Sequence, residues 1–221
     1  MHRLLVAALL SSALFAQKPH HEEPGGHPPN PHHQRTAKEW ANVLERDDRA
    51  EWQKPDEVVA ALGLREGEKV ADIGAGSGYF SVRLARAVGP KGKVYAVDIQ
   101  QDLMDYLAKR AKDEDLPNLI PTLGTAADPN LPAGSLDLIF ICDVGHHIEN
   151  RQAYYAKLAA GLAPGGKIAI VDFYKRELPV GPGVAMKIAK PEMISELEQA
   201  GFHLEASHDF LPYQYFLVFS R

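Results

Sequence analysis

The sequence predicts an α/β fold, a doubly wound seven-stranded sheet that is parallel except for an antiparallel last strand. Three observations support this. Short apolar runs alternate with amphipathic stretches of helical length, which is typical of a parallel sheet with helices on both faces. A glycine-rich segment follows the first apolar run, at residues 74–78. The last two apolar runs are separated only by a short link that contains Leu211 and Pro212, and so short a link favours an antiparallel pair.

Two helices are expected before the sheet, within residues 36–64. The second begins at Pro55, which suits the first turn of a helix, and ends at Gly63. The apolar runs then place strands at 69–73, 93–98, 119–123, 136–142, 167–173, 202–209 and 213–219. Amphipathic patterns between them place helices at 78–88, 101–114, 150–162 and 190–200.

The stretch from Val70 to Phe80 carries the main functional signal. It reads as a strand, then alternating glycines at Gly74, Gly76 and Gly78, then a helix. Glycine suits such a turn because it adopts backbone angles that are costly for other residues, and because it lets a ligand approach the backbone. The helix that follows points its free N–H groups at the polar end of a ligand.

A second signal is Asp98, which lies 20 residues beyond Gly78 at the end of the second strand. A carboxylate at this place can accept hydrogen bonds from both hydroxyls of a ribose. The spacing disfavours two other loops. The dinucleotide fingerprint requires a sixth-place glycine where Tyr79 stands, and no Gly-Lys-Ser/Thr follows to make a phosphate-binding Walker loop.

With these residues the chain resembles the class I S-adenosylmethionine-dependent methyltransferases, in particular the small-molecule group that includes the ubiquinone and menaquinone C-methyltransferases. The resemblance covers residues 56–174. It implies a Rossmann-like sheet, S-adenosylmethionine as cofactor, and transfer of a methyl group to a small-molecule or lipid-like acceptor. Two alternatives stay open: a non-catalytic cofactor- or metal-binding protein on the same fold, and a nicotinamide dehydrogenase.

The predicted cofactor site draws on the loops after the first four strands. Asp72 is expected to orient either the glycine loop or the cofactor's ammonium group, and Ile99 to pack on the adenine. Ala126 is expected to offer its backbone N–H to the same ring. Thr125 stands where the family has an acidic residue, and Asp128 is a candidate replacement. The predicted set is Asp72, Gly74, Ala75, Gly76, Gly78, Asp98, Ile99, Ala126 and Asp143.

The loop after the fourth strand contains His146 and His147. His146 is the candidate catalytic base, since an imidazole can take a proton from an acceptor near neutral pH, and His147 is a candidate substrate contact. The alternative role for both is structural, capping the next helix and closing the pocket. A metal site formed by Asp143 and Asp172 is disfavoured because Phe173 stands where metal-dependent catechol methyltransferases have asparagine.

Acceptor selection is expected in the loop 175–189 and in the tail at 209–215. Tyr213 is a candidate substrate contact, with hairpin packing as the alternative. Methyl transfer from a sulfonium asks little of side chains, because holding two reactants in line supplies roughly 7 to 11 kcal/mol. A general base is therefore not required, and the acceptor itself is not identified by the sequence.

Composition limits the class of partner. The chain has 221 residues, a net charge of −5 and a pI near 6.1, so nucleic acid is disfavoured as a substrate and a small molecule is favoured. Its single cysteine, Cys142, lies in an apolar run and is expected to be a buried hydrophobe. No metal site and no integral membrane span are predicted, and the sequence leaves the oligomeric state open.

The first 35 residues have a different character. Residues 1–16 resemble a secretory signal peptide, with a positive start and an apolar run that is short for a membrane span. Residues 17–35 are rich in proline and histidine and are expected to be a disordered linker. Export to the periplasm or the medium is therefore expected, with a cytoplasmic or membrane-associated protein as the alternative. The remaining expected divisions are helices at 36–64 and the methyltransferase domain at 65–221.

Overall fold

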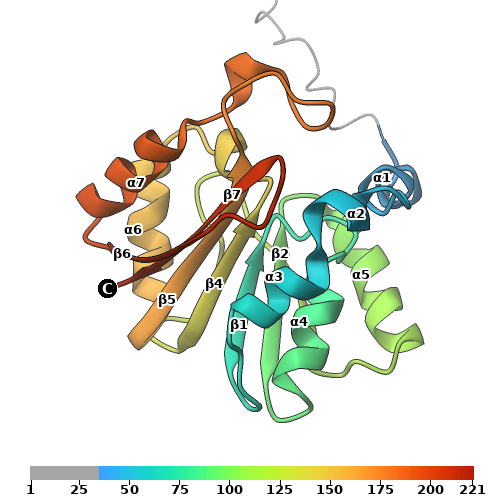
Figure 1. The fold of residues 1–221 in the computed structure, drawn as a ribbon. Coiled ribbons are helices and arrows are strands. Elements are labelled where there is room, and N and C mark those ends of the chain that lie inside the picture. The colour runs from blue at the N-terminus through green and yellow to red at the C-terminus, as the bar shows by residue number, and fades with distance from the viewer. Residues whose placement is uncertain (1–34) are drawn as a thin grey trace, which may run out of the picture. The chain divides into compact units, whose positions relative to one another are not determined.

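The sheet is doubly wound: the strand order runs outward in opposite directions from two central strands. The computed structural model describes residues 35–221, and its seven strands lie in the order β3-β2-β1-β4-β5-β7-β6 (Figure 1). The predicted signal peptide and all but the last residue of the predicted linker lie outside the described residues, so export stays a prediction. The strands are β1 (Lys69–Ile73), β2 (Lys93–Asp98), β3 (Leu119–Leu123), β4 (Leu136–Cys142), β5 (Leu162–Phe173), β6 (His203–His208) and β7 (Gln214–Ser220).

Strand direction follows the prediction. β1 pairs in parallel with β2 and β4, β2 with β3, and β4 with β5. β7 is antiparallel to both of its neighbours, β5 and β6. Ile73 at the end of β1 is in register with Val97 of β2 and Ile141 of β4, so the carboxyl ends of the central strands meet at one edge. The order reverses between β1 and β4, and ligands of open α/β sheets bind beyond such a point.

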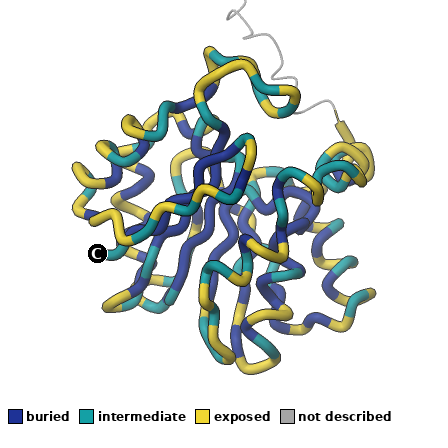
Figure 2. The backbone as a smooth tube through the Cα atoms, viewed as in Figure 1, coloured by how far each residue is buried: buried dark blue, intermediate teal, exposed yellow. Residues whose placement is uncertain are grey.

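Helices cover both faces of the sheet. They are α1 (Ala37–Leu44), α2 (Arg49–Gln53), α3 (Pro55–Ala61), α4 (Ser81–Val88), α5 (Gln101–Asp113), α6 (Arg151–Gly161) and α7 (Lys190–Gln199), with short 3-10 turns η2 (Gly145–His147) and η3 (Val184–Met186). One core joins α3, α4 and α5 to side chains such as Val70, and the other joins α6 and α7 to side chains such as Ala71. Because neighbouring residues of a strand point to opposite faces, β1 contributes to both cores. Figure 2 shows the central strands as the most buried part of the backbone.

Three elements differ from the prediction by more than two residues or in number. The first predicted N-terminal helix is two helices, α1 and α2, and α2 ends before Pro55 because the residue before a proline avoids the right-handed helical region. Lys54 there has φ 46° and ψ 58°. Helix α4 begins at Ser81 rather than at 78, since Gly78 has φ 90°. Strand β5 begins five residues earlier than predicted because Leu162 pairs with Leu136 across an irregularity in register.

Among the described residues, no helix is both long enough and apolar enough to cross a bilayer. Cys142 is buried and forms no disulfide, as expected.

We expect Gly92→Ala, in the turn before β2, to destabilise the fold by about 1–3 kcal/mol through overpacking. A Cβ atom there would lie 2.6 Å from the Glu68 carbonyl oxygen and 2.5 Å from Val88 Cγ2. Urea unfolding followed by circular dichroism measures the loss. Gly183→Ala is the matched control because nothing lies within 4 Å of its added Cβ. Equal stability of the two variants would contradict the packing described.

Candidate functional site

The glycine loop lies at the carboxyl end of β1 and is fastened to β2. The backbone N–H groups of Gly74 and Ala75 both donate to the Val97 carbonyl, at 2.8 and 2.9 Å. Gly74 has φ 70°, and a Cβ atom on it would come within 2.1 Å of Val144 Cγ2. The loop after β4 therefore approaches the glycine loop so closely that no side chain fits at this position.

Asp98 joins the end of β2 to the glycine loop. Its Oδ2 accepts the Gly76 N–H at 3.0 Å, and its Oδ1 accepts the N–H groups of Ile99 and Gln100 at 2.7 and 3.2 Å. Burial raises the pKa of Asp98, and these backbone hydrogen bonds oppose the rise. A carboxylate has about four lone-pair sites. Three are used here, so accepting both hydroxyls of a ribose would require one backbone donor to leave.

Two other predicted cofactor residues differ sharply in exposure. Ile99, directly beyond Asp98, has a relative exposure of 52%, which leaves an apolar surface where the prediction places the adenine. Ala126 is exposed in a turn that is closed by hydrogen bonds between Thr125 and Asp128. The carboxylate of Asp128 forms an ion pair with Lys157, so it has a structural partner away from the glycine loop. The adenine contact of Ala126 stays a prediction.

Asp72 is a buried carboxyl directly before the glycine loop. It is 3% exposed, and its Oδ2 accepts the Ser81 hydroxyl at 2.5 Å. Ser81 is the first residue of α4, so this bond ties the end of β1 to the start of that helix. Of the two predicted roles for Asp72, orienting the loop is the one that this contact supports. Burial raises the pKa of Asp72 to about 7, although the Ser81 hydrogen bond opposes the rise.

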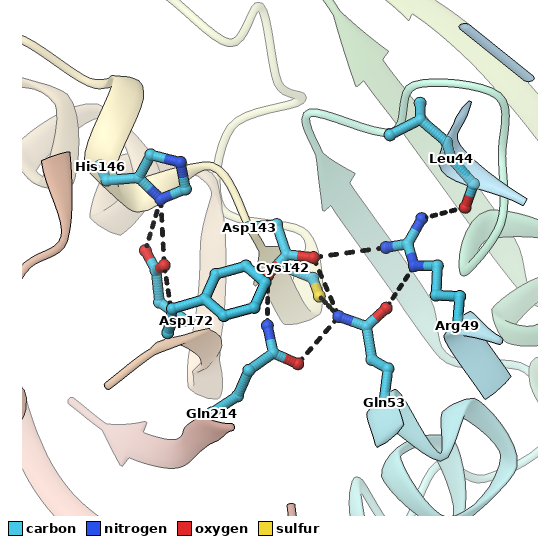
Figure 3. A network of polar contacts seen from close by, with 9 residues as sticks. Leu44, Arg49, Gln53, Cys142, Asp143, His146, Asp172 and Gln214 are labelled. Carbon is cyan, nitrogen blue, oxygen red and sulfur yellow. Dashed lines mark hydrogen bonds and ion pairs between the residues drawn. The ribbon is translucent and has the colours of Figure 1, made fainter. Parts of the chain in front are cut away.

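Asp143 follows β4 and is the centre of a buried polar network (Figure 3). It has φ 60°, a left-handed conformation that is uncommon for residues other than glycine. Gln53 Nε2 donates to its Oδ2 at 2.9 Å, Arg49 Nη2 lies 3.4 Å from the same oxygen, and Gln214 Nε2 donates to its Oδ1. Burial raises the pKa of Asp143, and the positive charge of Arg49 opposes the rise. The network fastens α2 to the carboxyl end of β4 and the start of β7.

Helices α1 and α2 therefore cover the glycine loop. Leu44 Cδ1 lies 2.7 Å from where a Cβ atom of Gly76 would stand. The Arg110 guanidinium donates to the Ser77 carbonyl at 3.0 Å and also pairs with Glu45, which ties the cover to the loop from the α5 side.

The sequence alone does not identify Arg49 or Gln214. The spacing of four between Arg49 and Gln53 places both on one helix face, which is the signal that could have identified the first. Gln214 carries no such signal, because it lies 161 positions from Gln53 in the chain.

His146 is held by a buried carboxylate. Its Nδ1 lies 3.0 Å from Asp172 Oδ1, and the two side chains are only 3% and 0% exposed. A carboxylate partner on Nδ1 favours the tautomer with hydrogen on Nδ1, which leaves Nε2 as the proton acceptor. His147 is exposed, and its ring centroid lies 4.2 Å from that of His146. Neither histidine caps α6, since the side chain of Asn150 does so by accepting the Ala153 N–H.

Aromatic side chains from three elements gather beside this network. The ring of Trp52 on α2 lies 5.8 Å from that of Phe173 and 6.3 Å from that of Tyr213, measured between centroids. Phe173 ends β5 and Tyr213 directly precedes β7. The structure thus brings the predicted substrate residue Tyr213 next to the cover. Tyr215, its alternating neighbour, is fully buried in the core.

We expect the free energy of unfolding of Asp72→Asn, compared with that of the wild type, to increase as the pH rises. A carboxyl whose folded pKa is about 7 instead of 3.8 binds a proton that the unfolded chain has lost. The stability that this proton gives to the folded wild type is therefore complete below about pH 4 and is lost as the pH rises to about 7. The loss is a few kcal/mol at most. Urea unfolding at pH 5, 6 and 7.5 measures this. Asp105→Asn, on the exposed side of α5, is the control. Parallel pH profiles for wild type and Asp72→Asn would contradict the burial of this charge.

Comparison with known proteins finds similarity to methyltransferases over this site. Residues 70–166 match the model of a methyltransferase domain. The chain is 26% identical over 171 residues to a 27-O-demethylrifamycin SV methyltransferase of Amycolatopsis mediterranei, covering 72% of this chain and 62% of that protein. It is 29% identical over 119 residues to a ubiquinone/menaquinone biosynthesis C-methyltransferase of Saccharophagus degradans, covering 53% and 48%. The chain thus spans between about half and two thirds of the length of these curated relatives.

A solved structure agrees over nearly its whole length. The crystal structure of an S-adenosylmethionine-dependent methyltransferase from Aquifex aeolicus superposes with a TM-score of 0.77 at 27% identity, covering 81% of this chain and 95% of that one. These similarities confirm the predicted resemblance, and the protein of that crystal structure is named as dependent on the predicted cofactor. The chain therefore carries a methyltransferase domain at residues 70–166 and has the fold of the S-adenosylmethionine-dependent methyltransferases.

Proposed function

We propose that this protein transfers a methyl group from S-adenosylmethionine to a small-molecule acceptor. The observation that carries the proposal is the hydrogen bond between Asp98 and the Gly76 N–H, which sets an acidic residue and a bare backbone turn side by side at the strand-order switch. The curated relatives are named as methyltransferases that act on small molecules, which supports the same reading.

The residues at the switch suit an adenosylated amino acid. The glycine loop offers backbone without side chains, Asp98 keeps one free lone pair for a ribose hydroxyl, and Ile99 presents an apolar surface for the base. Ser77 Oγ is buried in the loop and has no hydrogen-bond partner among the described residues, so a polar group remains for a ligand. When bound, the cofactor supplies an electrophilic methyl group on a sulfonium centre.

His146 is proposed as the base that takes the acceptor's proton. Among the described residues its hydrogen bonds engage Nδ1 alone, so Nε2 is left as the acceptor atom. Asp172 is the positioning residue, because it fixes the ring and is itself held by the Phe173 N–H at 2.8 Å. Asp143 has three protein donors, through which it holds the cover, and its contact with the cofactor stays a prediction.

We expect Asp98→Ala to weaken binding of S-adenosylmethionine by about tenfold or more, since it removes charge-assisted hydrogen bonds to the ribose and to the loop. Isothermal titration calorimetry with the cofactor and with S-adenosylhomocysteine measures the dissociation constants. Asp105→Ala removes an equal charge from an exposed site and should bind as the wild type does. An unchanged constant for Asp98→Ala would contradict the placement of the ribose, and wild type that binds neither compound would end the proposal.

An acceptor can be found by incubating metabolite mixtures with methyl-labelled cofactor. With that acceptor, we expect His146→Ala to lower kcat by about 10² to 10⁴, because the acceptor's proton then has no base to receive it. Cofactor affinity should not change. His203→Ala is the control, because His203 is an exposed histidine on β6. A wild-type kcat in His146→Ala would exclude His146 as the base.

A further inference from the structure

A lysine without a countercharge is buried in the loop that joins β5 to α7. Lys187 is 2% exposed, and its Nζ donates to the Arg176 carbonyl at 2.8 Å. Among the described residues, no carboxylate lies within 4.0 Å of this ammonium group, whereas Lys175 in the same loop is partnered by Glu192 at 3.8 Å. A lysine is almost never this buried unless it is paired, so the arrangement calls for an anion.

The ammonium group adjoins the aromatic side chains described above. Lys187 Nζ lies 5.9 Å from the centre of the Phe173 ring, within the range of a cation–π contact. Gly181 lies against the same ring, where a Cβ atom would be 2.6 Å from Phe173 Cε1. Phe173 in turn contacts Trp52, and Trp52 contacts Tyr213. A cation and a set of aromatic surfaces thus share one end of the sheet.

This group also adjoins the proposed reaction centre. Phe173 directly follows Asp172, which holds His146, and Trp52 directly precedes Gln53, which bonds to Asp143. The two carboxylates of the proposed reaction centre already have partners: Asp143 faces Arg49, Gln53 and Gln214, and Asp172 faces His146. Lys187 is therefore a buried cation that no carboxylate of the described residues balances within 4.0 Å.

We infer that the acceptor is an aromatic acid, with its ring against Trp52, Phe173 and Tyr213 and its carboxylate paired with Lys187. The inference rests on the proposed function, since it assigns the acceptor of that same site. An ammonium ion pairs strongly with a carboxylate in a site from which water is excluded, and aromatic side chains favour a planar ring. The amide of the same acid would lack the charge and would bind more weakly.

The test is calorimetry with benzoate, cinnamate and 2-naphthoate, each beside its amide, in the presence of saturating S-adenosylhomocysteine. In the wild type, at least one acid should bind about tenfold more tightly than its amide. Lys187→Met should abolish this preference, and Lys187→Arg should keep it. Lys175→Met, the same charge change in the same loop, should also keep it. Affinity for S-adenosylhomocysteine should be equal in all four proteins.

The other possible results distinguish failure of the inference from failure of the proposed function. Normal binding of S-adenosylhomocysteine with no acid preferred over its amide in the wild type overturns the inference and leaves the proposed function intact. A preference that survives Lys187→Met overturns it as well. If Lys187→Met does not fold, as judged by circular dichroism, the comparison of acid with amide in the wild type and in Lys187→Arg decides. Failure of the wild type to bind S-adenosylhomocysteine overturns the proposed function instead.

Discussion

The hydrogen bond from the Gly76 N–H to Asp98 is the contact on which the proposed cofactor site depends. It forms because β1 and β2 are parallel and in register, so that the turn after one strand meets the last residue of the other. The Gly74 and Ala75 N–H groups bind the Val97 carbonyl next to it, and the loop is thereby fixed before any ligand arrives. Fixing polar groups in advance lowers the cost of binding. Burial of Asp98 disfavours the charged form of its carboxyl and so raises its pKa.

The cover formed by α1 and α2 depends on the same edge of the sheet. Asp143 takes donors from Arg49, Gln53 and Gln214, so a helix before the sheet, a loop after β4 and the start of β7 meet at one carboxylate. Such a network is destabilising when one of its members lacks a partner, because that buried polar group has lost its hydrogen bonds to water without replacing them. The position of Trp52 follows from it, since this residue is adjacent to Gln53 on α2.

The proposed acceptor site is organised by β5. Its last two residues divide the tasks: Asp172 holds the ring of His146, and Phe173 meets Trp52 and the loop that carries Lys187. The two side chains point to opposite faces of the strand, as successive residues of a strand do. One strand end therefore sets both the proposed base and the aromatic surface, and the loop 175–189 supplies the charge.

The sequence by itself determined the strands, their directions, the glycine loop and Asp98, because these follow from local period, glycine spacing and link length. It could not single out Gln214, or Lys187 within the loop 175–189, since a lone polar residue carries no pattern. It also left Asp72 with two roles, and only the contact with Ser81 supports one of them. Which buried polar groups meet, and which charge is left without a partner, was decided by the tertiary structure alone, because both depend on distances between elements that folding brings together.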